Sequence, residues 1–156
     1  MHVENRIKEL GLKLEPIGKP MSSYAWVRRT GNLLFLAGHG PFLGESQSRP
    51  FQGKVGVDFT IEEAKEAARL VCLNCIYSIK EAIGDLDKVK QFVKVMAYVR
   101  CVEGMGDYYK VHDGSSDLII DIFGKEKGSH ARMTIGVVET PHHVPIALDM
   151  IVEVED

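Results

Sequence analysis

Arg132 is the residue in this sequence with the clearest capacity for chemistry. It stands near the start of the stretch 129–156, SHARMTIGVVETPHHVPIALDMIVEVED, in which apolar and polar residues alternate as in half-buried strands. A guanidinium offers a fork of donors that matches a planar anion such as a carboxylate. The alternative is a solvent-facing arginine at a strand end, because charged side chains are mostly exposed.

His39 is the titratable group at the end of an apolar run, residues 33–37. Its imidazole could exchange a proton near neutral pH, or it could be a structural histidine with satisfied hydrogen bonds. The glycine-rich loop that follows, 38–53, lacks the Gly-Lys-Ser/Thr ending of a P-loop. This loop is therefore not predicted to hold a phosphate.

The remaining cysteines and histidines suggest neither a redox nor a metal site. Cys72 and Cys75 are spaced as Cys-x-x-Cys but fall within a long helical pattern, which predicts buried core residues. His142 and His143 are adjacent, so on a strand turn they would point to opposite sides, and no ligand stands at a suitable spacing. We expect no metal and no cofactor.

Two periodicities predict the elements that would position these residues. Alternation predicts strands at 24–29, 33–37, 91–102 and in both halves of 129–156, the last two forming a hairpin around the turn at 140–143. Spacings of three and four predict helices at 3–12, 60–83 and 105–123, the last of them interrupted at 112–114. The longest has a capping box at Thr60 and Glu63, stops at Gly84, and carries an apolar stripe that needs a sheet to cover.

This order of elements predicts an α+β fold, a two-layer sandwich in which two main helices cover one face of a mixed sheet. The uncovered face would carry Met96, Tyr98, Ala147 and Ile151, and is more apolar than a solvated face should be. We therefore expect self-association through the sheet. At 156 residues the chain is expected to be a single domain, 1–156, with 1–20 as an N-terminal extension.

Two segments resemble the RidA/YjgF family of reactive-intermediate (enamine/imine) deaminases. The run His130-Ala131-Arg132, followed by two alternating strands around a proline-containing turn, is similar to one family signature. The run 31–41, GNLLFLAGHGP, is similar to the family's Gly-Asn, apolar strand, Ser-Gly-Gln-x-Pro segment. The run 114–118, GSSDL, resembles a longer-chain branch, and the likeness covers roughly residues 21–155.

The resemblance implies a chorismate-mutase-like fold and a homotrimer with ligand clefts between subunits. It also implies hydrolysis of a small 2-imino or enamino acid to a 2-oxo acid and ammonia. Arg132 would bind the substrate carboxylate, and a carboxylate on the last strand would position or activate water. The pocket would be lined by Tyr24, Ala37, Gly38, His39, Thr134 and Ala147.

Several positions depart from the family pattern. Ala37 stands where the deaminases have serine, His39 where better-known members have glutamine, Thr134 where they have cysteine, and Ala147 where they have the glutamate. Asp149 lies on the same strand face as Ala147, about 7 Å further along. Since a catalytic carboxylate needs to come within roughly 3 Å of the proton, Asp149 is the candidate replacement only if the substrate reaches it.

Composition limits the partners. A net charge of −3 and the absence of a basic stripe argue against a nucleic-acid partner, and so against a ribonuclease. No window approaches the roughly 20 apolar residues that would cross a bilayer, and the first ten residues lack the apolar region of a signal peptide. We expect a cytoplasmic protein without a membrane partner.

Two functions are consistent with these features. One is a deaminase-like hydrolase with Arg132 and Asp149 as catalytic residues. The other is a non-catalytic trimer that binds a small carboxylate as a regulator or chaperone-like protein. A carboxylate or imidazole within reach of Arg132 in the assembled cleft would favour the enzyme.

Overall fold

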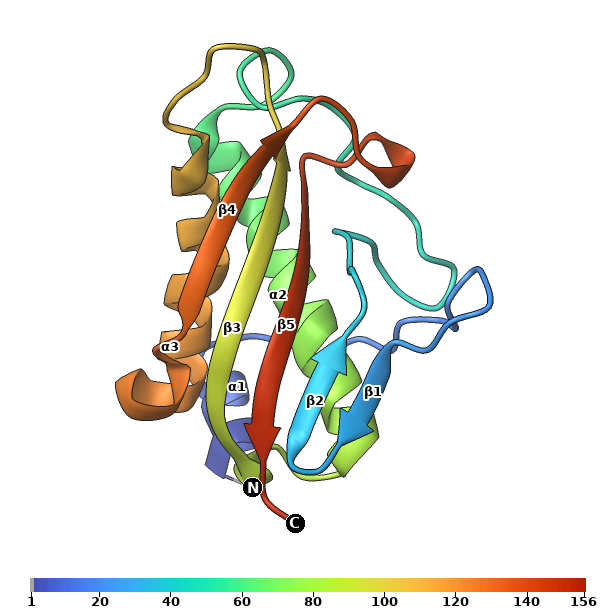
Figure 1. The fold of residues 1–156 in the computed structure, drawn as a ribbon, viewed down its shortest axis with the longest axis vertical. Coiled ribbons are helices and arrows are strands. Elements are labelled where there is room, and N and C mark those ends of the chain that lie inside the picture. Colours follow the sequence, from blue (N-terminus) through green and yellow to red (C-terminus); the bar gives the residue numbers. More distant parts are fainter. Residues whose placement is uncertain (1) are drawn as a thin grey trace.

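A mixed five-stranded sheet forms the front layer of the molecule in the computed structural model, which describes residues 2–156 (Figure 1). Its strands are β1 (Val27–Thr30), β2 (Leu33–Leu36), β3 (Val89–Arg100), β4 (Ala131–Val137) and β5 (Ile146–Val154). Their order is β1-β2-β5-β3-β4, and β3 and β4 are the pair that runs parallel.

The predicted hairpin between the last two strands is wrong. β3 lies between β4 and β5, so β4 pairs with β3 alone and the connection 138–145 passes over the end of β3. Alternation in a sequence reports which face a residue occupies, and it carries no information on which strand lies next to it. The turn itself contains a short 3₁₀ helix, η3 (Pro141–His143).

Three helices form the second layer: α1 (His2–Glu9), α2 (Ile61–Ile83) and α3 (Asp113–Gly128). α2 begins at the predicted capping box, in which the Thr60 side chain and the Glu63 side chain each accept a 3.1 Å hydrogen bond from the other residue's backbone. It ends at Gly84, whose φ of 78° favours glycine. Two short 3₁₀ helices, η1 (Leu86–Lys88) and η2 (Tyr108–His112), precede β3 and α3.

The core lies between the sheet and helices α2 and α3, so the predicted two-layer α+β architecture is confirmed (Figure 1). Cys72 and Cys75 on α2 are fully buried free thiols, as predicted. Burial raises the pKa of Cys72 to about 12 and that of Cys75 well above its usual range, which makes both thiols unreactive. None of the helices described is long and apolar enough to cross a membrane.

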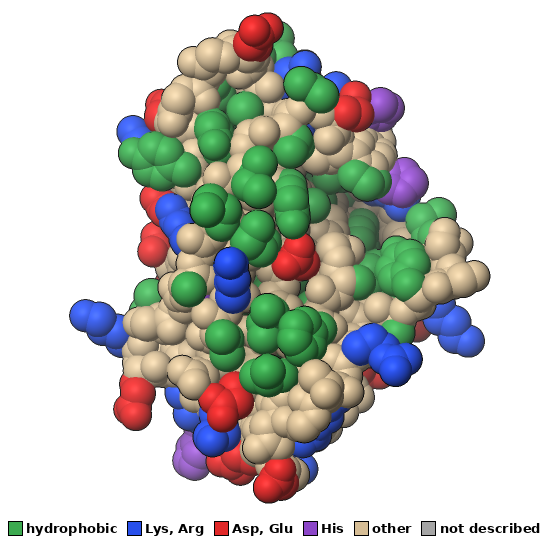
Figure 2. Space-filling view, in the orientation of Figure 1, with side chains coloured by type: hydrophobic (Ala, Val, Ile, Leu, Met, Phe, Trp, Pro, Cys, Tyr) green, Lys and Arg blue, Asp and Glu red, His purple; other side chains and the backbone are tan. Residues whose placement is uncertain are grey.

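The face of the sheet away from the helices is uncovered and largely apolar, and we call it the open sheet face. Cross-strand register places on it Phe35, Met96, Tyr98, Met133, Ile135, Ala147 and Ile151. Figure 2 shows hydrophobic side chains gathered over these strands, with isolated acidic and basic side chains among them. The predicted placement of the apolar residues of β3 and β5 is correct here, and β4 adds two more.

One segment of β3 departs from simple alternation. Strict alternation back from the buried Val95 predicts that Val93 is buried and Phe92 exposed, but in the structure Phe92 is buried and Val93 is exposed. The pairing with β5 shifts register between Val89 and Gln91 and again between Phe92 and Lys94. Each irregularity moves the following side chains to the other face, which period-two counting along one strand does not detect.

Candidate functional site

Arg132 lies on β4 at one edge of the sheet and points toward the helix layer. Its neighbour across the strand pair is Val95, which is fully buried. The guanidinium forms a 2.8 Å ion pair with Asp113 at the start of α3, and it donates a 3.1 Å hydrogen bond to the Ser116 hydroxyl. With 27% of its side chain exposed, Arg132 is held in place and still reaches solvent.

Hydrogen bonds beneath Arg132 fix how its supporting hydroxyl is oriented. His130 Nδ1 lies 2.7 Å from the Gly128 carbonyl, so this nitrogen must carry the proton and Nε2 must accept. The Ser116 hydroxyl lies 2.9 Å from Nε2 and therefore donates to it, which leaves the Ser116 oxygen free to accept from Arg132. Ser116 thus presents an acceptor to the guanidinium.

His112 completes this cluster from the end of η2. Its Nδ1 lies 2.7 Å from the Thr134 hydroxyl, and its buried Nε2 has no hydrogen-bond partner among residues 2–156. Burial, followed by the positive charge of Arg132, lowers the pKa of His112 to about 3, and burial also lowers the pKa of His130. Both imidazoles are neutral at physiological pH. His130 orients Ser116, which contacts the guanidinium, and His112 contacts Thr134. Thr134 contacts this cluster, although it had been predicted to line the pocket.

A second region lies at the opposite edge of the sheet, where a cavity of about 260 Å³ opens beside β1 and the beginning of β5. Tyr24, Gly38, His39 and Ala147 line it, so four of the predicted site residues come together there. Trp26 forms the floor: its ring lies 4.5 Å from that of His39, 5.8 Å from that of Phe42 and 5.8 Å from that of Tyr24. The residues lining this cavity include no carboxylate.

His39 is held by both of its ring nitrogens. Nδ1 lies 2.7 Å from the Ala37 carbonyl and Nε2 lies 2.8 Å from the Ser78 hydroxyl on α2. Its side chain is almost fully buried, and burial lowers its pKa to about 4. Since neither nitrogen is free to take a proton from water, His39 is the satisfied structural histidine that the sequence left as an alternative. Ala37 contributes its carbonyl to His39, and its side chain does not line the cavity.

Asp149 lies on the open sheet face, opposite to the face that carries Arg132. In the register of the sheet it pairs with Met96, whereas Arg132 pairs with Val95 on the buried side. The Tyr98 hydroxyl donates a 3.1 Å hydrogen bond to Asp149. Burial raises the pKa of Asp149, partly offset by this hydrogen bond and by Lys94. Within one chain, therefore, Arg132 and Asp149 do not converge.

Strand order separates Arg132 from the cavity as well. β4 and β2 are three strand positions apart, roughly 14 Å at the usual spacing. A small ligand cannot touch Arg132 and Tyr24 of the same chain at once. The predicted residues form three groups: an arginine cluster at one edge, an aromatic cavity at the other, and Asp149 on the face between.

Sequence reasoning missed four participants: Trp26, Tyr98, Asp113 and Ser116. Trp26 is the single tryptophan and stands two residues from Tyr24, which could have signalled an aromatic wall. Tyr98 had been counted only as an apolar residue of the uncovered face. The contact between Asp113 and Arg132 joins residues from two elements, so spacing along the chain gave no sign of it. No group of three or more potential metal ligands occurs in the described part of the chain.

Comparison with known proteins agrees with this fold. The family model described as "YjgF/chorismate mutase-like, putative endoribonuclease" matches residues 4–152. Protein TCP17 of Trypanosoma cruzi is 31% identical over 154 residues, which cover 99% of this chain and 95% of TCP17.

Two solved structures are similar over nearly their whole length. One is a "putative endoribonuclease" from Shewanella oneidensis, with a TM-score of 0.92, 29% identity, and coverage of 99% of this chain and 100% of that one. The other is protein Atu1372, of unknown function, from Agrobacterium tumefaciens, with a TM-score of 0.88, 32% identity, and coverage of 99% and 93%. The chain belongs to the YjgF/chorismate mutase-like family, which is the RidA/YjgF family that its motifs resemble.

Proposed function

We propose that this protein hydrolyses small 2-imino or enamino acids to 2-oxo acids and ammonia in clefts between the subunits of a homotrimer. Arg132 binds the substrate carboxylate, and Asp149, assisted by Tyr98, activates the attacking water. Family membership supports the class of protein, and three features of the site support the assignment of roles.

The first feature is the ability of Arg132 to hold a carboxylate. The guanidinium already forms a 2.8 Å ion pair with the carboxylate of Asp113, and it also donates a hydrogen bond to the Ser116 hydroxyl. A substrate carboxylate would share or replace the Asp113 contact. Charge-assisted hydrogen bonds of this kind are roughly twice as strong as neutral ones, so Arg132 can supply binding energy and orientation together.

The second feature carries the chemical part of the proposal: a half-buried carboxylate with a raised pKa lies beside the aromatic cavity. Asp149 is two residues from Ala147, which lines the cavity, and the same strand face presents both. The Tyr98 hydroxyl, on the cross-strand neighbour of Ala147, donates to Asp149 and so spans the distance between them. A raised pKa suits a general base because the proton taken from water can later be returned.

The proposed reaction is balanced without a cofactor. Asp149 takes a proton from water as the water oxygen bonds to the imine carbon, and it gives this proton to the nitrogen, which receives the double-bond electrons. Asp149 then moves the remaining hydroxyl proton to the nitrogen as the carbonyl forms, the carbon–nitrogen bond breaks, and ammonia leaves. Water is the only co-reactant.

The third feature is the open sheet face, which favours self-association. Exposed Phe35, Met133 and Ile135 lie on it, together with half-buried Met96 and Ile151. Because Arg132 and the cavity of one chain are too far apart for a small ligand, a cleft that combines the two needs residues from two copies. Packing of three such faces would cover the apolar surface and bring different edges together.

The test is hydrolysis of a 2-imino acid generated in situ by an amino-acid oxidase, with semicarbazide trapping the imine that remains. Wild-type protein should lower semicarbazone formation. Arg132→Ala should reduce kcat/KM by about 10-fold or more, and Asp149→Asn by about 100-fold, the usual range for loss of a general base. Arg6→Ala removes a surface arginine on α1 and should behave as wild type. Wild-type protein without effect on the imine would contradict the proposal.

A non-catalytic carboxylate-binding protein is the second candidate. It is favoured by the absence of a carboxylate from the residues that line the aromatic cavity and by the locked state of His39. In that case calorimetry should detect binding of a 2-oxo acid to wild type and not to Arg132→Ala, with no turnover by either. The same preparations, incubated with RNA, would test the expectation that the protein has no nucleic-acid partner.

A further inference from the structure

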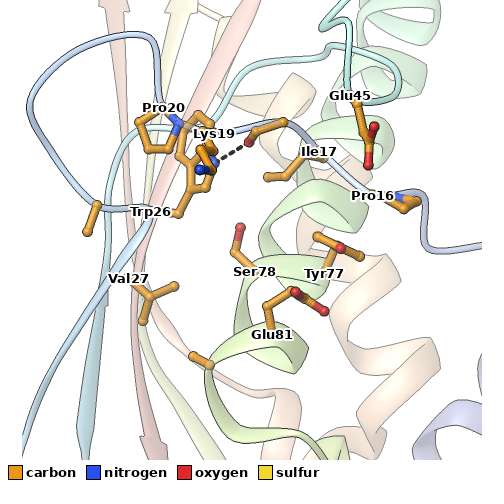
Figure 3. Close-up of a pocket in the computed structure, with 13 residues that line it drawn as sticks. Pro16, Ile17, Lys19, Pro20, Trp26, Val27, Glu45, Tyr77, Ser78 and Glu81 are labelled. Carbon is orange, nitrogen blue, oxygen red and sulfur yellow. Dashed lines mark hydrogen bonds between the residues drawn. The ribbon is translucent and has the colours of Figure 1, made fainter.

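A separate cavity of about 440 Å³ lies behind Trp26, between α2 and the N-terminal segment 12–20, which we call the N-terminal pocket (Figure 3). Its size falls within the range of small-molecule sites. Figure 3 shows Tyr77, Ser78 and Glu81 on α2, with Trp26 across the gap. Trp26 also lines the aromatic cavity described above, so the two pockets share this one ring.

The wall formed by the N-terminal segment is fixed by specific contacts. The Trp26 indole donates a 2.8 Å hydrogen bond to the Gly18 carbonyl, and Gln47, which is buried, donates a 2.9 Å bond to the Lys19 carbonyl. Gly18 lies so close to the backbone of Glu45 that a Cβ atom there would come within 2.4 Å of the Glu45 carbonyl oxygen. The pocket is therefore formed before any ligand arrives.

Polar groups in the pocket are mostly hydrogen-bond acceptors. His39 carries its proton on Nδ1, so Ser78 must donate to His39 Nε2, and the Ser78 oxygen can only accept from a ligand. Glu45 and Glu81 are exposed carboxylates that also line the pocket. A ligand that satisfies these groups must itself be a donor.

The charge balance also favours a cation. No ion pair within 4 Å joins Glu45 or Glu81 to any lysine or arginine among residues 2–156, and Lys19 is the single basic residue of the lining. Burial, the negative charge of Glu81 and a hydrogen bond to it, and then the charge of Glu45 raise the pKa of Tyr77. Both carboxylates line the pocket. The faces of Trp26 and Tyr77 provide surfaces on which a cation is stabilised.

We propose that the N-terminal pocket binds a small primary amine with an apolar or aromatic body. The ammonium group lies between Glu45, Glu81 and the Ser78 oxygen, and the body packs between Trp26 and Ile17. This site is independent of the proposed deaminase activity, because it shares neither Arg132 nor Asp149 with that reaction.

The single tryptophan provides a direct measurement. Benzylamine is the probe, and the shift of the Trp26 indole N–H resonance and the quenching of tryptophan fluorescence are the readouts, recorded on the full chain. Benzyl alcohol has nearly the same shape without the charge, and benzoate reverses the charge. Benzylamine should bind at least about 10-fold more tightly than benzyl alcohol. A benzoate signal belongs to the proposed carboxylate site and should not change in the Glu45 and Glu81 variants below.

Variants locate the ammonium group. Glu81→Gln and Glu45→Gln should each weaken benzylamine binding about 3-fold, and the double variant about 10-fold, since the carboxylates lie at an exposed rim. Glu66→Gln, an exposed residue of α2 away from the pocket, should leave affinity unchanged. Lys19→Gln should strengthen binding by removing the competing charge.

The aromatic cavity is lined by Arg49 and by no carboxylate, so an amine bound there would not respond to these changes. Equal binding of benzyl alcohol and benzylamine, or an affinity that the Glu45 and Glu81 variants leave intact, would overturn the proposal.

Discussion

The two edges of the sheet offer different features to a ligand. At the β4 edge, Arg132 is surrounded by polar partners that fix its guanidinium, and its supporting hydroxyl from Ser116 is itself oriented by His130. At the β1 edge, Trp26 and Tyr24 shape a cavity whose one buried imidazole, His39, is fully hydrogen-bonded. The first edge has charge and little room, and the second has room and no carboxylate.

This difference gives the open sheet face a part in the proposed function. The proposed site combines the Arg132 guanidinium with the aromatic cavity, and one chain keeps these two three strands apart. The surface between the two edges is the apolar face that a single chain leaves uncovered. Assembly would therefore complete the site and the core together, so loss of assembly should remove ligand binding even when every candidate residue is intact.

The largest effect is expected from breaking the assembly. Ile135→Asp places a charge in the middle of the open sheet face, where its burial between subunits would be strongly unfavourable. We expect the oligomer to dissociate into single chains, measured by light scattering after size-exclusion chromatography, and imine hydrolysis to be lost.

Val57→Asp is the matched control, because Val57 is 70% exposed in a loop away from the sheet. It should change neither the mass nor the activity. An Ile135→Asp protein that remains oligomeric, or a monomer with full activity, would show that the two edges do not need a second copy.

The buried histidines of the two edges should be visible in the pH dependence of stability. The pKa of His39 is about 4 in the folded chain and near 6.5 in the unfolded chain, because burial disfavours the imidazolium. Between these values the unfolded state binds more protons, so the free energy of unfolding falls as pH falls, by about 1.4 kcal/mol per pH unit for this histidine. Denaturant unfolding at several pH values measures the slope.

His39→Gln keeps a donor and an acceptor at this position and removes the titration. Between about pH 6.5 and about pH 4, this variant should lower the slope of the unfolding free energy against pH by the contribution of one bound proton. Ser23→Ala, at an exposed position without a titratable group, should leave the slope as in wild type. If the slope in His39→Gln is also unchanged, the imidazole is not neutral and buried in solution.

The smallest effect is expected from Asp113, whose carboxylate forms an ion pair with Arg132. Asp113→Asn removes the charge that competes with a ligand, so affinity for a 2-oxo acid should rise about 3-fold, in keeping with the modest energy of a partly exposed ion pair. Calorimetry measures the change. Asp117→Asn, on an exposed position of α3, is the control, and an affinity that falls in Asp113→Asn would mean that Asp113 holds Arg132 in its binding geometry.

Local features of this sequence were sufficient to predict most of the elements. The capping box at Thr60, the stop at Gly84 and the alternation in β5 each depend on residues close in the chain, and all appear in the structure. The sequence could not predict which strands pair with each other, because residues in β4 and β5 alternate in the same way whether or not the two strands are neighbours. The faces of residues 92 and 93 in β3 could not be predicted for the same reason, because the shift in register depends on pairing with β5.

The candidate site shows the same division between local features, which could be predicted, and contacts between distant segments, which could not. Tyr24, Gly38, His39 and Ala147 could be grouped by family motifs, and the cavity brings them together. The ion pair between Arg132 and Asp113, and the hydrogen bond between Tyr98 and Asp149, join segments that only the folded chain makes adjacent. In the proposed function these groups combine across two chains, and the sequence indicates such an assembly only through the apolar residues of the open sheet face.

The position of β5 has a consequence for synthesis of the protein. This strand, residues 146–154, lies at the centre of the sheet between β2 and β3, and its side chains supply much of the core. When only β1 to β4 of a nascent chain have emerged from the ribosome, the edges of β2 and β3 that pair with β5 are both unpaired. Folding on the ribosome must therefore wait for the last strand, and a chain shortened by that strand would expose both edges to pairing with other chains.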